Sequence, residues 1–201
     1  NPPNIEKIIS LEPDLVLGAK GFHGKALAQL NDLGIETITS EVRNWNDLDS
    51  LIEEIGEYLL VDIPPLDSLA PYCNYDPSEA SLDGTIVLVS ISPLLSPNKN
   101  SWAGSLLDKF NINNVIRDIQ SKSGFAGYVT LSPEVLLEKN PDNIIVVDTS
   151  NDMRSLFLSK SYTSALKAVN KNRVYSFDYY GLINPGSIAS VNNACLKLIK
   201  L

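Results

Sequence analysis

The hydrophobic positions along the chain switch repeatedly between two spacings, one typical of helices and one typical of buried strands. Ile5, Ile8 and Ile9 lie at helical spacing, whereas the compact run of residues 15–17 suits a strand buried in a parallel sheet. Residues 25–39 repeat the same order, a helix and then a strand. Alternating helices and strands predict an α/β fold.

The pattern breaks near the middle of the chain. A third helix is predicted to begin after Asn44, whose side chain can cap it. Between residues 58 and 84, four prolines exclude one continuous helix. They are Pro64, Pro65, Pro71 and Pro77. We interpret this stretch as a linker between an N-terminal lobe, residues 1–57, and a C-terminal lobe, residues 85–201.

The second half of the chain returns to alternation and predicts a complete α/β lobe. Its expected elements are a strand over 85–91, helices over 102–110 and 132–139, a strand over 143–148, a helix over 161–169, a strand over 173–177 and a closing helix from about Ile188. The first half offers only two strands and about three helices. We therefore expect the N-terminal lobe to be incomplete, with a partner element missing.

The charge of the chain limits its partners. At pH 7 the formal net charge is −8, with acidic and basic residues interspersed and no basic stripe on which a phosphate backbone could lie. We therefore expect no nucleic-acid partner. No apolar run approaches the roughly 20 residues that span a bilayer. The chain starts at Asn1, and we expect any targeting segment to lie upstream of it.

The two cysteines, Cys73 and Cys195, lack CxxC spacing and have no histidine nearby, so they indicate neither a zinc site nor a redox pair. Two interpretations remain. The favoured one is a pair of separate buried thiols, because free cysteine behaves as a small core residue. The alternative is a disulfide between them.

Enzyme motifs are missing from the sequence, which contains no GxxxxGKS/T loop, GxGxxG turn, GxSxG elbow or HExxH pair. Gly18, Gly21 and Gly24 follow a strand at intervals of three, which fits a flexible strand-to-helix turn better than a dinucleotide site. His23 is the only histidine, so a catalytic triad or a histidine-rich metal site would need unusual substitutes. We expect no enzyme, no cofactor and no metal site.

Four stretches of the chain, taken in order, resemble one family. They are PNIEKIISLEPDLVLG with LNDLGIETI, then SWAGSLLDKFNINNVI, GYVTLSPEVLLEKNPDNIIVV and ALKAVNKNRVYSFDYYGLINPGS. The family is that of the periplasmic substrate-binding proteins of ABC importers for vitamin B12, ferric siderophores and haem. The resemblance covers nearly the whole chain apart from the linker. It implies two α/β, Rossmann-like lobes joined by a rigid helix, with a ligand cleft between them and little hinge motion.

The same resemblance implies a partner in the membrane. In such proteins a glutamate on each lobe docks onto arginines of the permease dimer, and the matching positions are Glu6 and Glu134. Charge pairs at an interface rim speed encounter and fix register. The alternative is local, because each glutamate lies in a first helical turn, where it favours the helix dipole. We also expect a monomer in the periplasm or elsewhere outside the cytoplasmic membrane, with or without a lipid anchor.

Ligand contacts carried over from the family fall on loops at strand ends or helix starts, where open α/β sheets bind ligands. The resemblance assigns this role to Lys20, Gly21, Phe22, His23, Leu95, Trp102, Tyr128, Asp178, Tyr179 and Tyr180. A slot lined by aromatic side chains suits a flat, largely apolar ligand. The alternative is core packing for Phe22 and Trp102 and a solvated loop for His23.

Departures from the family narrow the choice of ligand. Ala19 and Leu182 stand where cobalamin binders can carry a tryptophan and a basic residue, which favours a siderophore or haem over a corrinoid. The proline-punctuated linker replaces the family's long connecting helix and would allow more hinge motion. Some relatives join the closing helix to the helix matching SLLDKF by a disulfide. Here that helix offers Phe110, so we expect Cys195 to pack as a thiol.

Two other functions compete with delivery of a ligand to an importer. One is an enzyme or redox protein on the same scaffold, because a fold does not fix function. Its best residues, His23, Glu134 and Asp178, come from separate segments and form no catalytic spacing. The other is a degenerate receptor lobe that binds a protein. The resemblance favours capture of a ferric siderophore, haem or corrinoid.

Overall fold

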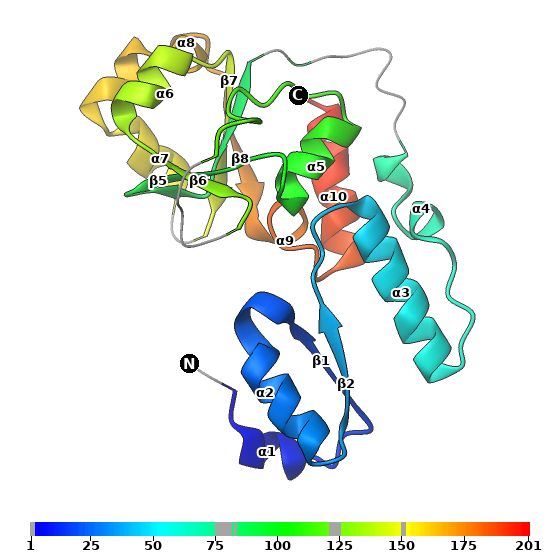
Figure 1. Cartoon of the computed structure of the whole chain (residues 1–201). Helices are drawn as coiled ribbons and strands as arrows, with labels where there is room; N and C mark the ends of the chain where they lie inside the picture. The colour runs from blue at the N-terminus through cyan, green and yellow to red at the C-terminus, as the bar shows by residue number, and fades with distance from the viewer. Residues whose placement is uncertain (1–2, 75–81, 83, 121–125, 150–151) are drawn as a thin grey trace. The chain divides into compact units, whose positions relative to one another are not determined.

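The computed structural model (Figure 1) describes residues 3–74, 82, 84–120, 126–149 and 152–201. The chain forms two compact units, Asn1–Val42 and Arg43–Leu201. Each unit is built from alternating helices and strands, so the predicted α/β fold class is confirmed. The residue ranges expected for two lobes and a linker stay a prediction, and the two compact units are described below one at a time.

The N-terminal unit consists of one two-stranded parallel sheet and two helices. Asn4 caps the first helix by accepting a hydrogen bond from the Lys7 backbone N–H at 3.0 Å. The elements, in order, are α1 (Ile5–Ile9), β1 (Leu15–Ala19), α2 (Lys20–Asp32) and β2 (Glu36–Ser40). Helix α2 packs on both strands and buries Leu27 and Leu30. The sequence predicted all four elements.

The start of α2 differs from the prediction. Lys20, Gly21, Phe22 and His23, expected in the turn after the first strand, form the first turn of the helix. No strand-to-helix loop intervenes, because Ala19 is both the last residue of β1 and the N-cap of α2. An added Cβ at Gly21 or Gly24 would meet no neighbouring atom, so neither glycine is required for a tight turn.

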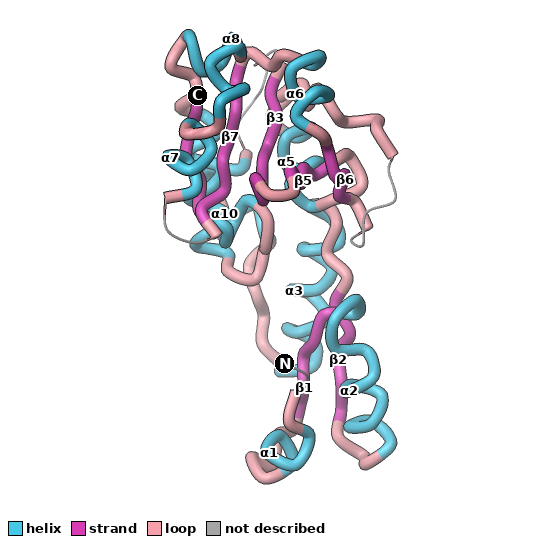
Figure 2. Tube along the Cα trace, turned by 90° about the vertical axis from the view of Figure 1, so that its left-hand side faces the viewer, coloured by secondary structure: helices cyan, strands magenta, loops and turns pink. Residues whose placement is uncertain are grey.

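The C-terminal unit is organised around a parallel sheet with strand order β3-β7-β8. These strands are β3 (Thr85–Leu88), β7 (Asn143–Asp148) and β8 (Val174–Asp178). Figure 2 shows β3 and β7 running side by side. Residues 143–147 of β7 are all buried, as expected for a central strand covered on both faces. The continuous apolar run in the sequence therefore predicted this strand correctly.

A second sheet was missed at the sequence level. It is antiparallel, with strand order β4-β5-β6, and consists of β4 (Ser90–Ile91), β5 (Leu94–Pro97) and β6 (Tyr128–Leu131). Tyr128, expected in a loop before a helix, is instead the first residue of a strand and pairs with Pro97. The strands are only two to four residues long, and Pro97 ends β5, so the sequence shows no clear alternation of apolar and polar residues there.

Helices cover both sides of the parallel sheet, with α6, α7 and α8 on one side and α5 and α10 on the other (Figure 1). The helices and shorter helical turns of this unit are α3 (Trp45–Leu59), α4 (Leu66–Leu69), η1 (Pro71–Cys73), α5 (Trp102–Lys109), α6 (Pro133–Lys139), α7 (Met153–Leu158), η3 (Ser161–Ala165), α8 (Lys167–Asn170), α9 (Tyr179–Leu182) and α10 (Ile188–Ile199). The helix expected over 161–169 is divided into η3 and α8, and α7 was not predicted. Among the described residues, no helix has the length and apolarity needed to cross a membrane.

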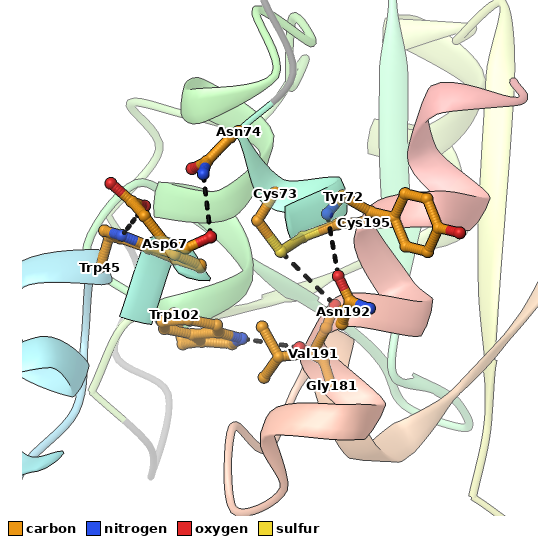
Figure 3. Close-up of a disulfide and its surroundings, with 10 residues drawn as sticks. All are labelled: Trp45, Asp67, Tyr72, Cys73, Asn74, Trp102, Gly181, Val191, Asn192 and Cys195. Atoms are coloured by element: carbon orange, nitrogen blue, oxygen red, sulfur yellow. Dashed lines mark hydrogen bonds between the residues drawn. A yellow bond between two sulfur atoms is a disulfide. The ribbon is translucent and has the colours of Figure 1, made fainter. Parts of the chain in front are cut away.

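The described part of the expected linker packs against the closing helix of the C-terminal unit. After α3 the chain forms α4 and η1, both in contact with α10. The predicted break in the helix is confirmed at Pro64, Pro65 and Pro71, while Pro77 lies outside the described residues. The backbone N–H of Tyr72 donates to the Asn192 side-chain oxygen at 2.9 Å (Figure 3). This segment is therefore part of the C-terminal unit.

The prediction of two separate thiols is wrong, because Cys73 and Cys195 form a disulfide with their Cα atoms 5.1 Å apart (Figure 3). Both cysteines are buried. The partner of the closing helix is thus the turn η1, whereas Phe110, at the position where some relatives carry the second cysteine, is a buried core residue. The sequence did not indicate the bond because 122 positions separate the two residues.

Candidate functional site

The structure brings Tyr128 and Tyr179, which come from different segments of the chain, close enough for their phenol groups to interact. Tyr128 begins β6, and Tyr179 directly follows Asp178, the last residue of β8. Burial raises the pKa of the Tyr128 hydroxyl to about 12, and the neighbouring Tyr179 phenol adds to the increase. Tyr128 therefore stays a neutral hydroxyl, able to donate and accept hydrogen bonds, at any physiological pH.

Tyr180 extends this aromatic surface. The rings of Tyr179 and Tyr180 meet edge to face with their centroids 5.5 Å apart, a favourable geometry for aromatic pairs. Tyr180 is exposed. We call Tyr128, Tyr179 and Tyr180 the tyrosine cluster. It lies where β8 leaves the sheet, at the carboxyl edge that open α/β sheets use for ligands.

The backbone of α9 turns sharply after the two tyrosines. Tyr180 has extended torsion angles, and Gly181 has a φ of 94°, a value that favours glycine. A side chain at Gly181 would also collide with the backbone carbonyl of Ser190 in α10. The turn that presents Tyr179 and Tyr180 therefore requires a glycine at this position.

Trp102 holds the turn that follows Tyr179 and Tyr180. Its indole N–H donates to the Gly181 carbonyl at 2.8 Å, which joins α5 to α9 (Figure 3). Only 3% of Trp102 is exposed, so the core interpretation of this residue holds. Its ring stacks on Trp45 with centroids 6.2 Å apart, and Trp45 donates to Asp67 at 3.1 Å. The two tryptophans thus connect α3, α4, α5 and α9.

Leu95 and Asp178, the other expected contacts of the C-terminal unit, flank the tyrosine cluster. Leu95 is half-buried in β5, where it pairs with Thr130 of β6. Asp178 is exposed and forms an ion pair with Lys197 of α10 at 2.8 Å. A solvent-exposed pair of this kind contributes at most about 1 kcal/mol to stability. The Asp178 carboxylate therefore remains open to exchange partners at little cost.

The expected contacts of the N-terminal unit lie together in the first turn of α2. Phe22 is 74% exposed, which excludes the core interpretation of its side chain. The Nδ1 atom of His23 accepts a hydrogen bond from the backbone N–H of Ala19, 3.1 Å away. The side chain therefore satisfies the backbone N–H of the residue that caps α2. Lys20 forms an exposed ion pair with Glu41 at 3.1 Å. Phe22 is the member of this group whose side chain is most open to a ligand.

The two expected docking glutamates are both exposed at the starts of helices. Glu6 lies in the first turn of α1 and Glu134 in the first turn of α6. A hydrogen bond with the Ser132 side chain lowers the pKa of Glu134, and its own backbone N–H contributes further. Both carboxylates are exposed to solvent and lie where a negative charge stabilises the start of a helix.

One further feature was not predicted from the sequence. A hollow of about 260 Å³ lies between the start of α3, the side of α5 and the loop that precedes α5. It is lined by Arg43, Asn44, Lys99, Asn100, Ser105 and Asp108, and we call it the polar hollow. These residues come from three segments and form no sequence motif. Within the described parts of the chain, no group of three or more histidine, cysteine or acidic residues is placed to hold a metal ion.

Solved structures of one class, the periplasmic binding proteins, share the fold of this chain. No family model matches the chain. The vitamin B12 binding protein BtuF of Vibrio cholerae superposes with a TM-score of 0.72 and 20% identity, covering 98% of this chain and 78% of that one. The heme-binding protein BhuT, in complex with two hemes, gives a TM-score of 0.77 and 20% identity over 98% and 79%. The fold is that of periplasmic binding proteins, as the sequence resemblance predicted.

The comparison of sequences points to the same class. An uncharacterized ABC transporter substrate-binding lipoprotein of Bacillus subtilis, YvrC, is 25% identical over 196 residues, which is 87% of this chain. The chain spans 58% of the length of that relative. It is therefore similar, in sequence and in fold, to substrate-binding proteins of ABC transporters.

Proposed function

We propose that the chain belongs to an extracytoplasmic substrate-binding protein that captures a ferric siderophore, haem or corrinoid and delivers it to an ABC importer. The tyrosine cluster is the observation that supports this proposal. It combines an edge-to-face pair of rings, an exposed aromatic face at Tyr180 and a protonated hydroxyl at Tyr128. Such a surface suits a flat, mostly apolar ligand with polar groups at its edge.

The disulfide supports a site of action outside the cytoplasm. Structural disulfides form and persist mainly in oxidising compartments and are rare in the cytosol. The bond between Cys73 and Cys195 is buried and closes a long loop, both features of a structural disulfide. The Bacillus subtilis relative is named a substrate-binding lipoprotein, which also supports a location outside the cytoplasm. The protein would meet its ligand there as a monomer.

Ligand capture is tested by titration with ferric siderophores, hemin and cobalamin while intrinsic fluorescence is recorded. We expect one class to quench the emission at saturation. Tyr180→Ala should weaken that ligand about two- to tenfold, because an aromatic stacking contact contributes roughly 0.5–1.5 kcal/mol. Tyr72→Ala is the matched control, since Tyr72 is also exposed and only its backbone N–H bonds to Asn192. Absence of binding across the whole panel would refute the proposal.

Docking to the permease is tested separately. We propose that Glu6 and Glu134 contact arginines of the permease dimer. The double variant Glu6→Lys, Glu134→Lys should lose uptake in cells while its ligand affinity stays near that of the unmodified protein. Glu53→Lys with Glu57→Lys is the matched control, because it introduces the same charge change on α3. Equal loss of uptake in both double variants would contradict specific docking.

A further inference from the structure

The polar hollow has the composition of a site for an oxyanion. Two cations, Arg43 and Lys99, line it together with the amide side chains of Asn44 and Asn100 and the hydroxyl of Ser105. Guanidinium, ammonium, amide and hydroxyl groups can all donate hydrogen bonds to carboxylate or phosphate oxygens. The hollow therefore offers donors from several directions.

The one carboxylate in the lining is already neutralised. Both oxygens of Asp108 accept hydrogen bonds from Arg117, from Nε at 3.0 Å and from Nη2 at 3.0 Å. A bidentate arrangement of this kind is the strongest form of carboxylate pairing. Asp108 therefore opposes a bound anion much less than an unpaired carboxylate would.

Lys99 has an ion-pair partner that an anion can displace. Its ammonium group lies 2.7 Å from Asp118, whose side chain is 69% exposed. Exposed pairs contribute little net free energy because water solvates both partners well. Asp47, the other nearby carboxylate, accepts a hydrogen bond from the Arg43 backbone N–H at 2.8 Å and belongs to the first turn of α3.

The loop that carries Lys99 and Asn100 is fixed by buried Asn98. The Asn98 side chain donates to the Ile119 carbonyl at 3.0 Å and accepts from the Asn100 backbone N–H at 2.9 Å. On the opposite side, a Cβ at Gly104 of α5 would collide with the Asn98 carbonyl. Because the loop is ordered before any ligand arrives, little conformational entropy is lost on binding.

The hollow also adjoins the tyrosine cluster. The Asn98 backbone N–H donates to the Gly127 carbonyl at 2.9 Å, and a Cβ at Gly127 would lie 2.7 Å from the Asn100 carbonyl. Gly127 directly precedes Tyr128. One ligand with an aromatic body and an acidic side group would therefore find complementary surfaces close together on the C-terminal unit.

We propose that the polar hollow binds a carboxylate or phosphate group, supplied by an acidic group on the captured ligand or by a free anion. The first source rests on the proposed function, whereas the second does not. Helix α3 adds to the attraction, because it begins at the hollow and the N-terminal end of a helix dipole favours negative charge.

The two tryptophans supply a direct reporter of binding. Trp45 and Trp102 are the only tryptophans in the chain, and they directly follow Asn44 and Ser101 at the two helix starts. The full chain is titrated at low ionic strength with inorganic phosphate, with sodium chloride at matched ionic strength as reference. We expect a saturable change in tryptophan emission with phosphate and none with chloride.

A pair of double variants tests the residues. Arg43→Gln with Lys99→Gln should weaken phosphate binding at least about tenfold, because two charge-assisted donors are lost. Lys171→Gln with Arg173→Gln is the matched control, since it removes the same charges and Lys171 also pairs with an aspartate. Thermal unfolding confirms that both variants are folded. No saturable phosphate signal, or an equal loss in both double variants, overturns a free-anion site.

A second experiment identifies the source of the anion. The protein is titrated with hemin and with hemin dimethyl ester, which lacks free carboxylates, and binding is measured by the absorbance of the hemin. If the ligand supplies the carboxylate, the Arg43, Lys99 double variant weakens hemin about tenfold and leaves the ester unchanged. If the anion is free, the variant affects phosphate alone. Unchanged hemin affinity together with no phosphate signal refutes the inference. Phosphate binding without binding of any siderophore, hemin or cobalamin refutes only the proposed function.

Discussion

The two compact units differ in how much of their apolar surface they bury. In residues 3–42 the buried apolar side chains are Leu27, Leu30 and Ile38. The C-terminal unit instead has a core of contiguous buried residues, in which β3 and most of β7 are inaccessible to solvent. Since local stability follows buried apolar area, the C-terminal unit supplies most of the free energy of unfolding.

The same contrast separates the two groups of candidate contact residues. In the N-terminal unit, Phe22 stands on an exposed helical turn that only the His23 side chain caps. In the C-terminal unit, the tyrosine cluster is held by the Gly181 turn and by buried Trp102. A ligand that needs a pre-ordered surface would gain more from the second group, because less entropy is lost on binding.

Removal of the disulfide should give the largest effect. Cys73→Ala with Cys195→Ala opens a loop of 122 positions, for which chain entropy predicts a loss of about 4–5 kcal/mol in the free energy of unfolding. Urea unfolding followed by tryptophan emission measures the C-terminal unit alone, because Trp45 and Trp102 both belong to it. An unchanged midpoint would mean that packing around α10 already holds the segment in place.

A matched pair of phenylalanines tests the contrast in burial directly. Phe157 is fully buried, so Phe157→Ala should cost about 3–5 kcal/mol in stability. Phe22→Ala should change stability by no more than about 0.5 kcal/mol, because surface substitutions rarely exceed that. Both values come from urea midpoints at constant m-value, followed by far-ultraviolet circular dichroism because its signal includes the helices of both units. Comparable costs for the two variants would show that α2 is packed more tightly than its exposure indicates.

The bond between Trp102 and Gly181 should have an intermediate effect. Trp102→Phe keeps a ring in the core and removes the indole N–H, which leaves the Gly181 carbonyl unpaired in a buried position. A loss of about 1–3 kcal/mol in stability is expected. Ligand affinity should fall as well, since the turn below Tyr179 and Tyr180 loses its support. Lower stability with unchanged ligand affinity would show that the hydrogen bond between Trp102 and Gly181 contributes to folding but not to ligand binding.

The smallest expected effect concerns the titration of Tyr128. Its pKa of about 12 lies above the ordinary value of 10, so the folded state favours the protonated hydroxyl. The corresponding stability is fully present below pH 10 and is lost as pH rises toward 12. The ultraviolet difference spectrum between the unmodified protein and Tyr128→Phe should show one phenol ionising near pH 12. Ionisation near pH 10 would place Tyr128 in contact with water.

Hydrophobic spacing was sufficient to predict most of the architecture. It located β1 and β7 as compact apolar runs, and β2 and β8 from the alternation of helices and strands. Helix α3 was predicted from the cap at Asn44, and α5, α6 and α10 from the same alternation. It failed for the antiparallel sheet, whose strands are two to four residues long and carry Pro97 at an end. Most of the pairing in this sheet, between β5 and β6, joins segments that are distant in the sequence and leaves no local period.

The candidate site was only partly visible in the sequence. The resemblance singled out Tyr128 and Tyr179, and the structure brings these two side chains close to each other. Their assignment as ligand contacts stays a prediction. The polar hollow gave no signal, because Arg43, Lys99 and Ser105 are ordinary surface residues that only the packing of α3 against α5 brings together. The disulfide was equally invisible in the sequence, because its two cysteines meet only when η1 packs against α10.

The disulfide also determines how the protein has to be produced for any of these measurements. Synthesis in a reducing bacterial cytosol yields the dithiol form, and two cysteines as deeply buried as Cys73 and Cys195 oxidise slowly once the chain has folded around them. Secretion before folding lets oxidation and folding proceed together. Preparations from the two routes would contain different fractions of the cross-linked species, and thiol counting under denaturing conditions distinguishes them before a single titration is begun.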